Sequence, residues 1–121
     1  MTVTIYHNPQ CSTSRNTLAM IRESGVEPHI VEYLQVPFTR GALGELIRDA
    51  GLPVRAVLRQ KGPLYDELGL SDSSLSDDQL LDAMAANPIL IQRPIVVTSL
   101  GVRLCRQAET VREILPARQQ P

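Results

Sequence analysis

Cys11 is the residue of this sequence best placed for nucleophilic chemistry. It follows the turn-forming residues Asn8, Pro9 and Gln10 and precedes a segment that is expected to be helical. A cysteine at the start of a helix lies beside free backbone N–H groups and the positive end of the helix dipole, and both favour the thiolate. The alternative is a buried packing cysteine, but polar flanking residues are more typical of a loop. We therefore expect a reactive thiol.

The residues that follow Cys11 exclude two kinds of thiol chemistry. Ser14 stands where the second cysteine of a Cys-x-x-Cys pair would be, so a local dithiol cycle is excluded. Thr17 stands where a phosphatase loop would carry its arginine. Regeneration of Cys11 would therefore need an external thiol or the distant Cys105. We interpret Cys105 as a packing residue because apolar neighbours place it in a predicted strand.

His7 is the titratable residue that precedes the turn before Cys11. As an imidazolium it would stabilise a nearby thiolate, and a partly solvated histidine at a strand end is an equal alternative. The sequence has only two cysteines and two histidines, and none has ligand-like spacing. We therefore expect no metal site.

Arginines supply the candidate anion-binding groups. Arg93 directly precedes Pro94 at the entrance to a predicted strand, and Arg106 lies at the end of another strand. Arg55 and Arg59 share one face of a short predicted helix because they are four residues apart. Guanidiniums that converge would bind an anion, whereas the alternative is that all are surface charges.

Composition limits the class of protein. The chain has 121 residues and is 43% hydrophobic, which suits one domain with a core. A net charge of −1 makes nucleic acid an unexpected partner. No apolar run approaches the roughly 20 residues that span a membrane. The N-terminus lacks the pattern of a signal peptide, and two cysteines are too few for a disulfide-rich secreted scaffold. We therefore expect a cytoplasmic, reducing environment and no membrane partner.

Hydrophobic periodicity predicts an α/β fold. Strands are expected over residues 2–7 and 29–34, joined by a helix over 12–24 that ends at Gly25, which implies a parallel pair. Later elements are listed in chain order: helices over 39–51, 53–58 and 76–87, a hairpin of strands 95–98 and 102–105, and a helix over 109–115. This β-α-β, helical insertion, β-β-α order matches a thioredoxin-like mixed four-stranded sheet. We expect one domain over residues 1–121, with 117–121 a frayed tail.

Four separated motifs resemble the glutaredoxin-dependent arsenate reductase family. They are residues 7–18 (HNPQCSTSRNTL), 54–59 (VRAVLR), 88–97 (PILIQRPIVV) and 101–106 (GVRLCR). They occur in the family's order, and the resemblance covers about residues 2–116. One departure is Ser12, where many members are expected to have glycine, and we expect it to alter affinity more than mechanism.

The resemblance implies a single-domain arsenate reductase that converts arsenate to arsenite in arsenic detoxification. It implies that Cys11 is the nucleophile, that His7 helps to set its pKa, and that Arg59, Arg93 and Arg106 surround the oxyanion. Pro94 would be the cis-proline typical of the fold. Cys11 would form an arsenic adduct, glutathione would attack as co-substrate, and glutaredoxin would remove the mixed disulfide. Neither a bound cofactor nor a metal is implied.

Two other functions remain as alternatives. A thioredoxin-fold redox regulator that binds RNA polymerase shares the expected fold, but such relatives often carry an early cysteine pair, which the Cys11-x-x-Ser14 sequence lacks. The other alternative is a related family member with a different thiol substrate. The sequence separates this alternative from an arsenate reductase less well.

Overall fold

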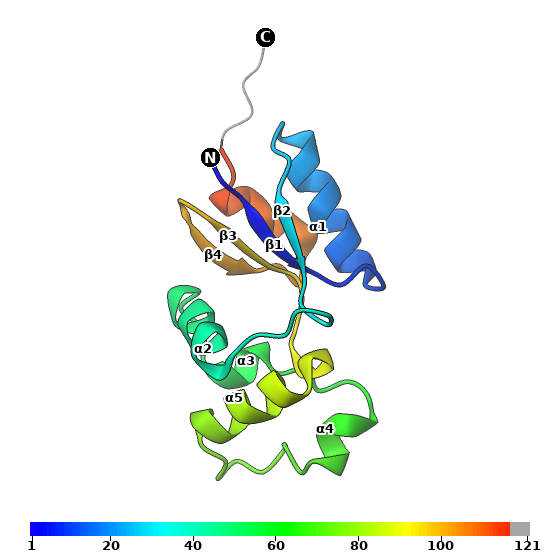
Figure 1. Ribbon diagram of the computed structural model, residues 1–121, viewed down its shortest axis with the longest axis vertical. Helices are drawn as coiled ribbons and strands as arrows, with labels where there is room; N and C mark the ends of the chain where they lie inside the picture. The colour runs from blue at the N-terminus through cyan, green and yellow to red at the C-terminus, as the bar shows by residue number, and fades with distance from the viewer. Residues whose placement is uncertain (117–121) are drawn as a thin grey trace. The chain divides into compact units, whose positions relative to one another are not determined.

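The computed structural model describes residues 1–116, and these form two compact units (Figure 1). The first unit combines Met1–Val36 with the segment that begins at Arg93, and the second unit is the intervening segment Pro37–Gln92. The single domain expected over residues 1–121 stays a prediction. The frayed tail expected at 117–121 lies outside the described residues.

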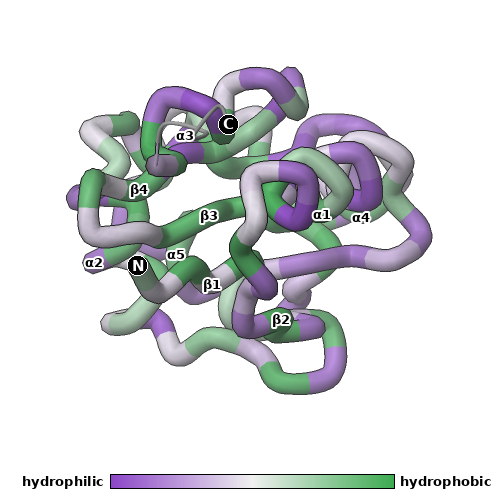
Figure 2. Tube along the Cα trace, turned by 90° about the horizontal axis from the view of Figure 1, so that it is seen from above, coloured by the Kyte–Doolittle hydropathy of each residue, from purple (hydrophilic) through white to green (hydrophobic). Residues whose placement is uncertain are grey.

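The first unit contains a mixed four-stranded sheet in the order β2-β1-β3-β4. The strands are β1 (Thr4–His7), β2 (His29–Glu32), β3 (Ile95–Thr98) and β4 (Gly101–Leu104). Strand β1 is parallel to β2 and antiparallel to β3, which is antiparallel to β4. The parallel pair and the hairpin predicted from the sequence are therefore confirmed. Strand β3 is one of the two interior strands, and residues on both of its faces are buried. This burial suits its largely apolar sequence, which Figure 2 shows.

One face of this sheet is covered by α1 (Ser12–Glu23) and by the 3-10 helix η2 (Ala108–Ile114). Ile5 of β1 lies opposite Ile30 of β2 on one side and Val96 of β3 on the other. The buried core residues of this face are Val3, Ile5, Ile21, Val96, Cys105, Val111, Ile114 and Leu115. Burial of these side chains fixes α1 against the sheet and so fixes the position of its N-terminus.

The second unit is helical. Its elements are α2 (Arg40–Asp49), α3 (Val54–Val57), α4 (Pro63–Glu67), α5 (Asp77–Ala86) and the 3-10 helix η1 (Pro88–Leu90). Thr39 caps α2, and Ser76 with Gln79 forms the capping box expected at the start of α5. Leu58 and Ile91 form an isolated antiparallel bridge.

The sequence predicted most elements but not all of them. Helix α4 was missed because it is a single short turn that begins at Pro63 and buries none of its residues, so it has no apolar periodicity. The C-terminal element is a 3-10 helix that starts at Ala108, slightly earlier than expected. The predicted β-α-β, helical insertion, β-β-α order is otherwise confirmed. Within residues 1–116, no helix combines the length and the apolar character needed to cross a membrane.

Candidate active site

The sheet topology brings three segments of the first unit to one edge. Strand β1 ends at this edge with His7, and the antiparallel β3 begins there, because Tyr6 pairs with Ile95. Strand β4 also ends there, since Leu104 pairs with the same Ile95. The residues that follow β1, precede β3 and follow β4 therefore meet at this edge, although they are far apart in sequence.

The turn after β1 places Cys11 at the N-cap of α1. The Asn8 carbonyl accepts a hydrogen bond from the Cys11 N–H at 3.0 Å, and the Asn8 side-chain oxygen accepts one from the Gln10 N–H at 3.0 Å. Cys11 has extended backbone angles, and its carbonyl accepts the helical bond from the Arg15 N–H. The thiol is partly exposed. This turn therefore holds a reachable sulfur at the positive end of a helix.

The surroundings of Cys11 favour its thiolate. Burial alone raises the pKa of the Cys11 thiol, but the Ser14 backbone N–H and the side chains of Arg93 and Arg106 lower it. The net effect is a pKa below the ordinary value for cysteine. A larger fraction of the side chain is therefore nucleophilic at neutral pH than in an unperturbed cysteine.

Arg93 is a buried cation beside this thiol. Its side chain is only 7% exposed, and its Nε and Nη1 have no hydrogen-bond partner among residues 1–116. An arginine of this kind is costly unless an anion completes its hydrogen bonds. The peptide bond between Arg93 and Pro94 is cis, as the resemblance to the arsenate reductase family implied. The two unpartnered nitrogens of this buried guanidinium are therefore suited to bind an oxyanion next to Cys11.

Arg106 supports both Arg93 and Cys11. Its Nη1 donates a hydrogen bond to the Arg93 carbonyl, and its side chain also favours the Cys11 thiolate. The Cys105 N–H donates to the Pro94 carbonyl at 2.9 Å, which ties the end of β4 to the start of β3. Two of the three predicted arginines therefore lie at the same edge as the thiol.

His7 is buried at the same edge, where its Nδ1 lies 2.6 Å from the Ser14 Oγ. Burial lowers the pKa of His7, Glu32 opposes this effect, and Arg22 and Arg15 add to it. The net shift is downward, so the neutral ring is the favoured form at pH 7. This is not the imidazolium considered from the sequence. A role of His7 in setting the pKa of Cys11 stays a prediction.

Comparison with known proteins assigns the family. A model of the ArsC family matches residues 6–114, which is most of the chain. The chain belongs to the ArsC family. It is 61% identical over 116 residues to an arsenate reductase of Rhizobium meliloti, and the match covers 96% of this chain and 83% of the relative. It is 60% identical over 114 residues to an arsenate reductase of Escherichia coli K12, with 94% and 81% covered.

A solved structure extends this agreement to the fold. The arsenate reductase from Vibrio cholerae superposes with a TM-score of 0.92 at 49% identity, and the match covers 95% of this chain and 98% of that structure. The expected resemblance to the arsenate reductase family and the thioredoxin-like α/β fold are thus confirmed. Within residues 1–116, no group of three or more His, Cys, Asp or Glu side chains is arranged to hold a metal ion.

The third arginine suggested by the family motifs, Arg59, belongs to the second unit. Its backbone N–H donates to the Leu90 carbonyl at 2.6 Å, and its side chain is partly buried. Arg59 lies beyond the end of α3 (Val54–Val57), so the prediction that Arg55 and Arg59 share one helix face is wrong: Leu58 already has extended backbone angles. Arg55, which is on α3, donates to the carbonyls of Leu70 and Asp72 and so stabilises the chain between α4 and α5. A substrate-binding role of Arg59 stays a prediction.

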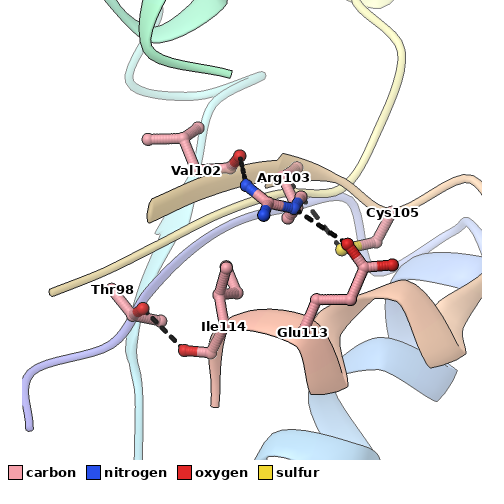
Figure 3. A network of polar contacts seen from close by, with 6 residues as sticks. All are labelled: Thr98, Val102, Arg103, Cys105, Glu113 and Ile114. Atoms are coloured by element: carbon pink, nitrogen blue, oxygen red, sulfur yellow. Dashed lines mark hydrogen bonds and ion pairs between the residues drawn. The ribbon is translucent and has the colours of Figure 1, made fainter. Parts of the chain in front are cut away.

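Cys105, the second thiol of this ArsC-family chain, has a different environment (Figure 3). It is fully buried, and its Sγ lies 3.8 Å from the Arg103 carbonyl oxygen. Burial raises its pKa to about 12, with a further increase from Glu113 that Arg103 opposes. Arg103 bridges the Val102 carbonyl and the Glu113 carboxylate. Cys105 therefore lies in the core, as its predicted packing role requires.

The sequence reasoning missed one group of site residues, the polar side chains buried beneath Cys11. Ser14 was noted only as a missing cysteine, yet it is 0% exposed and contacts His7. A signal was available: Ser14, Thr17 and Ile21 follow helical spacing, and all three face the core. Polar residues on the apolar face of a helix need internal partners, which indicates a built polar cluster.

Proposed function

We propose that this chain is an arsenate reductase that reduces arsenate to arsenite through a Cys11–arsenic adduct, with glutathione and glutaredoxin as reductants, in arsenic detoxification. The observation that carries the proposal is the partly exposed thiol of Cys11, which has a lowered pKa and lies beside the buried guanidinium of Arg93, whose Nε and Nη1 have no partner among residues 1–116. The names of the relatives at about 60% identity supply the substrate.

Arsenate is a tetrahedral oxyanion whose charge must be offset before a thiolate can approach it. In this proposal the Nε and Nη1 of Arg93 bind its oxygens, and Arg106 adds a second positive charge. Arg59 is proposed as a third ligand on the strength of the motif at 54–59. The combination of thiolate and cations selects an electrophilic oxyanion over a neutral substrate.

The first chemical step joins sulfur to arsenic. The Cys11 thiolate attacks As(V), a sulfur–arsenic bond forms, and the bond from arsenic to its hydroxyl oxygen breaks. When the substrate is the singly protonated dianion, that hydroxyl takes up one proton from solvent and leaves as water. Arsenic stays in the +5 oxidation state in this step. The free N–H groups at the start of α1 and the cationic side chains stabilise the charge that develops on the remaining oxygens.

The second step transfers two electrons. A glutathione thiolate attacks the Cys11 sulfur, a disulfide forms between them, and the sulfur–arsenic bond pair leaves with arsenic, which becomes As(III) and is released as arsenite. Glutaredoxin then attacks the glutathione sulfur of the mixed disulfide and returns the Cys11 thiolate. An external thiol is required because Ser14 takes the place of a local resolving cysteine.

The proposed cycle uses glutathione as a co-substrate and neither a metal nor a bound cofactor. It consumes reduced thiols, and Cys11 must itself be reduced to act. We therefore place the protein in the cytoplasm, where thiol reductants are maintained.

A coupled assay tests the proposal. Purified protein is mixed with arsenate, glutathione, glutaredoxin, glutathione reductase and NADPH, and each component is omitted in turn while NADPH oxidation is followed. We expect turnover only when arsenate, glutathione and glutaredoxin are all present. If no NADPH is consumed although Cys11 still titrates below the ordinary pKa, the thiol is reactive but arsenate is not its substrate.

A further inference from the structure

Beneath Cys11 lies a small buried cluster of His7, Asn8 and Ser14. Their exposed fractions are 6%, 2% and 0%. The Ser14 Oγ accepts a hydrogen bond from the Asn8 backbone N–H at 3.1 Å and lies 2.6 Å from the His7 Nδ1. One hydroxyl thus links the end of β1, the turn that leads to Cys11, and the first turn of α1.

The contact between His7 and Ser14 is compatible with two hydrogen-bond directions. The Ser14 oxygen accepts from Asn8 and keeps a second lone pair, so it either accepts from a protonated His7 Nδ1 or donates its own proton to an unprotonated Nδ1. Donation by Ser14 requires a neutral ring with its proton on Nε2. The charged groups that face His7 are Glu32 on β2 and Arg15 and Arg22 on α1, and with burial their net effect lowers the pKa of His7, which agrees with a neutral ring.

Ser14 also acts on Cys11 through its backbone. Cys11 is the N-cap of α1, and Ser14 is the third helical residue, whose N–H is one that an N-cap side chain ordinarily accepts. The cap lacks a side-chain hydrogen bond of ordinary geometry, yet the Ser14 N–H makes the largest single contribution that lowers the pKa of Cys11, ahead of the hydrogen bond from Arg93. The thiolate is therefore the form that completes this cap.

We infer that Ser14 is a positioning residue for Cys11 and that His7 acts on the thiolate through the Ser14 hydroxyl, which fixes the first turn of α1, rather than as a positive charge beside the sulfur. The inference rests on the proposed function only in taking Cys11 as the nucleophile. It assigns His7 a hydrogen-bonding function that a neutral side chain of suitable shape can replace.

Asparagine is the replacement that separates the two modes of action. The side-chain amide of His7→Asn places a hydrogen-bonding atom close to the position of Nδ1 but carries no charge at any pH. His7→Leu removes both the charge and the hydrogen bond. Ser14→Ala removes the hydroxyl but leaves the backbone N–H. Thr17→Val is the matched control, because it deletes a buried hydroxyl one turn further along α1, where Thr17 donates to the Thr13 carbonyl.

The experiment is the pH dependence of iodoacetamide alkylation, followed by mass spectrometry of the peptide that contains Cys11 in the full-length protein. Thermal unfolding of each variant checks that it is folded. We expect Ser14→Ala and His7→Leu each to raise the pH midpoint of Cys11 alkylation by about 0.5 to 1 unit, which corresponds to the loss of one modest hydrogen bond. We expect the double variant to match either single one, and His7→Asn and Thr17→Val to stay close to the wild type.

Two results would overturn the inference. One is a His7→Asn midpoint raised as far as that of His7→Leu, and the other is a full His7→Leu shift that persists in the Ser14→Ala background. Both would indicate that His7 acts as a charge. Alkylation needs no arsenate, so this outcome is independent of whether the coupled assay supports arsenate reduction.

Discussion

The two cysteines of this protein lie in the same unit, but their surroundings have opposite effects on them. Cys11 is partly exposed at the start of α1, where an N–H group and two guanidiniums hold its pKa below the ordinary value. Cys105 is fully buried after β4, and burial raises its pKa to about 12. Both thiols lie at the end of a regular element, so the difference comes from their surroundings: partial exposure at the start of a helix beside cations favours the thiolate, whereas full burial disfavours it.

Local cations do not by themselves explain the difference. Arg103 lies near Cys105 and lowers its pKa, but it is engaged by Glu113, and burial outweighs its effect. Arg93 near Cys11 has two nitrogens without a partner among the described residues. Two features therefore distinguish the regions: Cys105 is more deeply buried and its nearby guanidinium is paired with a carboxylate, whereas Cys11 lies beside a guanidinium with two free nitrogens among the described residues.

The largest expected effect is that of Cys11→Ser on turnover. The hydroxyl of serine is a far weaker nucleophile at neutral pH, so we expect arsenate-dependent NADPH oxidation to fall by more than about 1000-fold. Cys105→Ser is the matched control, for which we expect turnover within about twofold of the wild type. Wild-type turnover by the Cys11 variant would exclude this residue as the nucleophile, and a large loss in a folded Cys105 variant would make Cys105 a resolving thiol.

The second-largest expected effect is the difference in alkylation rate between Cys11 and Cys105 in the wild type at pH 7. Thiolate is lost from Cys11 only as the pH falls through its lowered pKa, whereas Cys105 ionises only towards pH 12. We expect iodoacetamide to label Cys11 about 1000-fold faster than Cys105, as measured by peptide mass spectrometry. Comparable labelling of both in the folded protein would refute the contrast.

Replacing Arg93 tests the role of the unpartnered cation. We expect Arg93→Met, which keeps the length of the side chain, to lower kcat/KM for arsenate about 100-fold or more and to raise the midpoint of Cys11 alkylation. Arg103→Met is the matched control, since Arg103 pairs with Glu113 beside Cys105. Equal losses of kcat/KM in the two variants would show that removing either arginine has the same effect. The loss would then not be specific to Arg93, and its assignment as the anion-binding residue would fail.

The smallest expected effect is on stability at alkaline pH. The raised pKa of Cys105 means that the folded state disfavours its thiolate, so stability is intact below the ordinary pKa near 9 and is lost as the pH rises towards about 12. We expect urea unfolding to show a loss of up to about 1.4 kcal/mol per pH unit in this window. Cys105→Ala should remove this slope, whereas Cys11→Ser should retain it. A slope unchanged in the alanine variant would contradict the assignment.

The sequence predicted features that depend on local signals. The Asn8-Pro9-Gln10 turn placed Cys11 at a helix start, and the capping box at Ser76 located α5. Helix α4 lacked such a signal, because none of its residues is buried. Its end could not be inferred from apolar spacing.

The polar interactions of the site depend on tertiary packing, which the sequence does not encode locally. Arginine is usually exposed, so its residue type alone predicts an exposed Arg93. Its burial depends on the pairing of β3 with the neighbouring strands, which are distant in sequence. The bond between His7 and Ser14 joins a strand to a helix across a turn, and no helical or strand periodicity predicts it. The neutral state of His7 follows from that burial in the same way.

The most direct test of the central claim is to trap the mixed disulfide. The protein is incubated with arsenate and reduced glutathione but without glutaredoxin, and the site of glutathione attachment is mapped by mass spectrometry. We predict one glutathione on Cys11, formed only when arsenate is present. Attachment to Cys105, or equal attachment to Cys11 without arsenate, would contradict the assignment of Cys11 as the residue that receives arsenate and passes on its electrons.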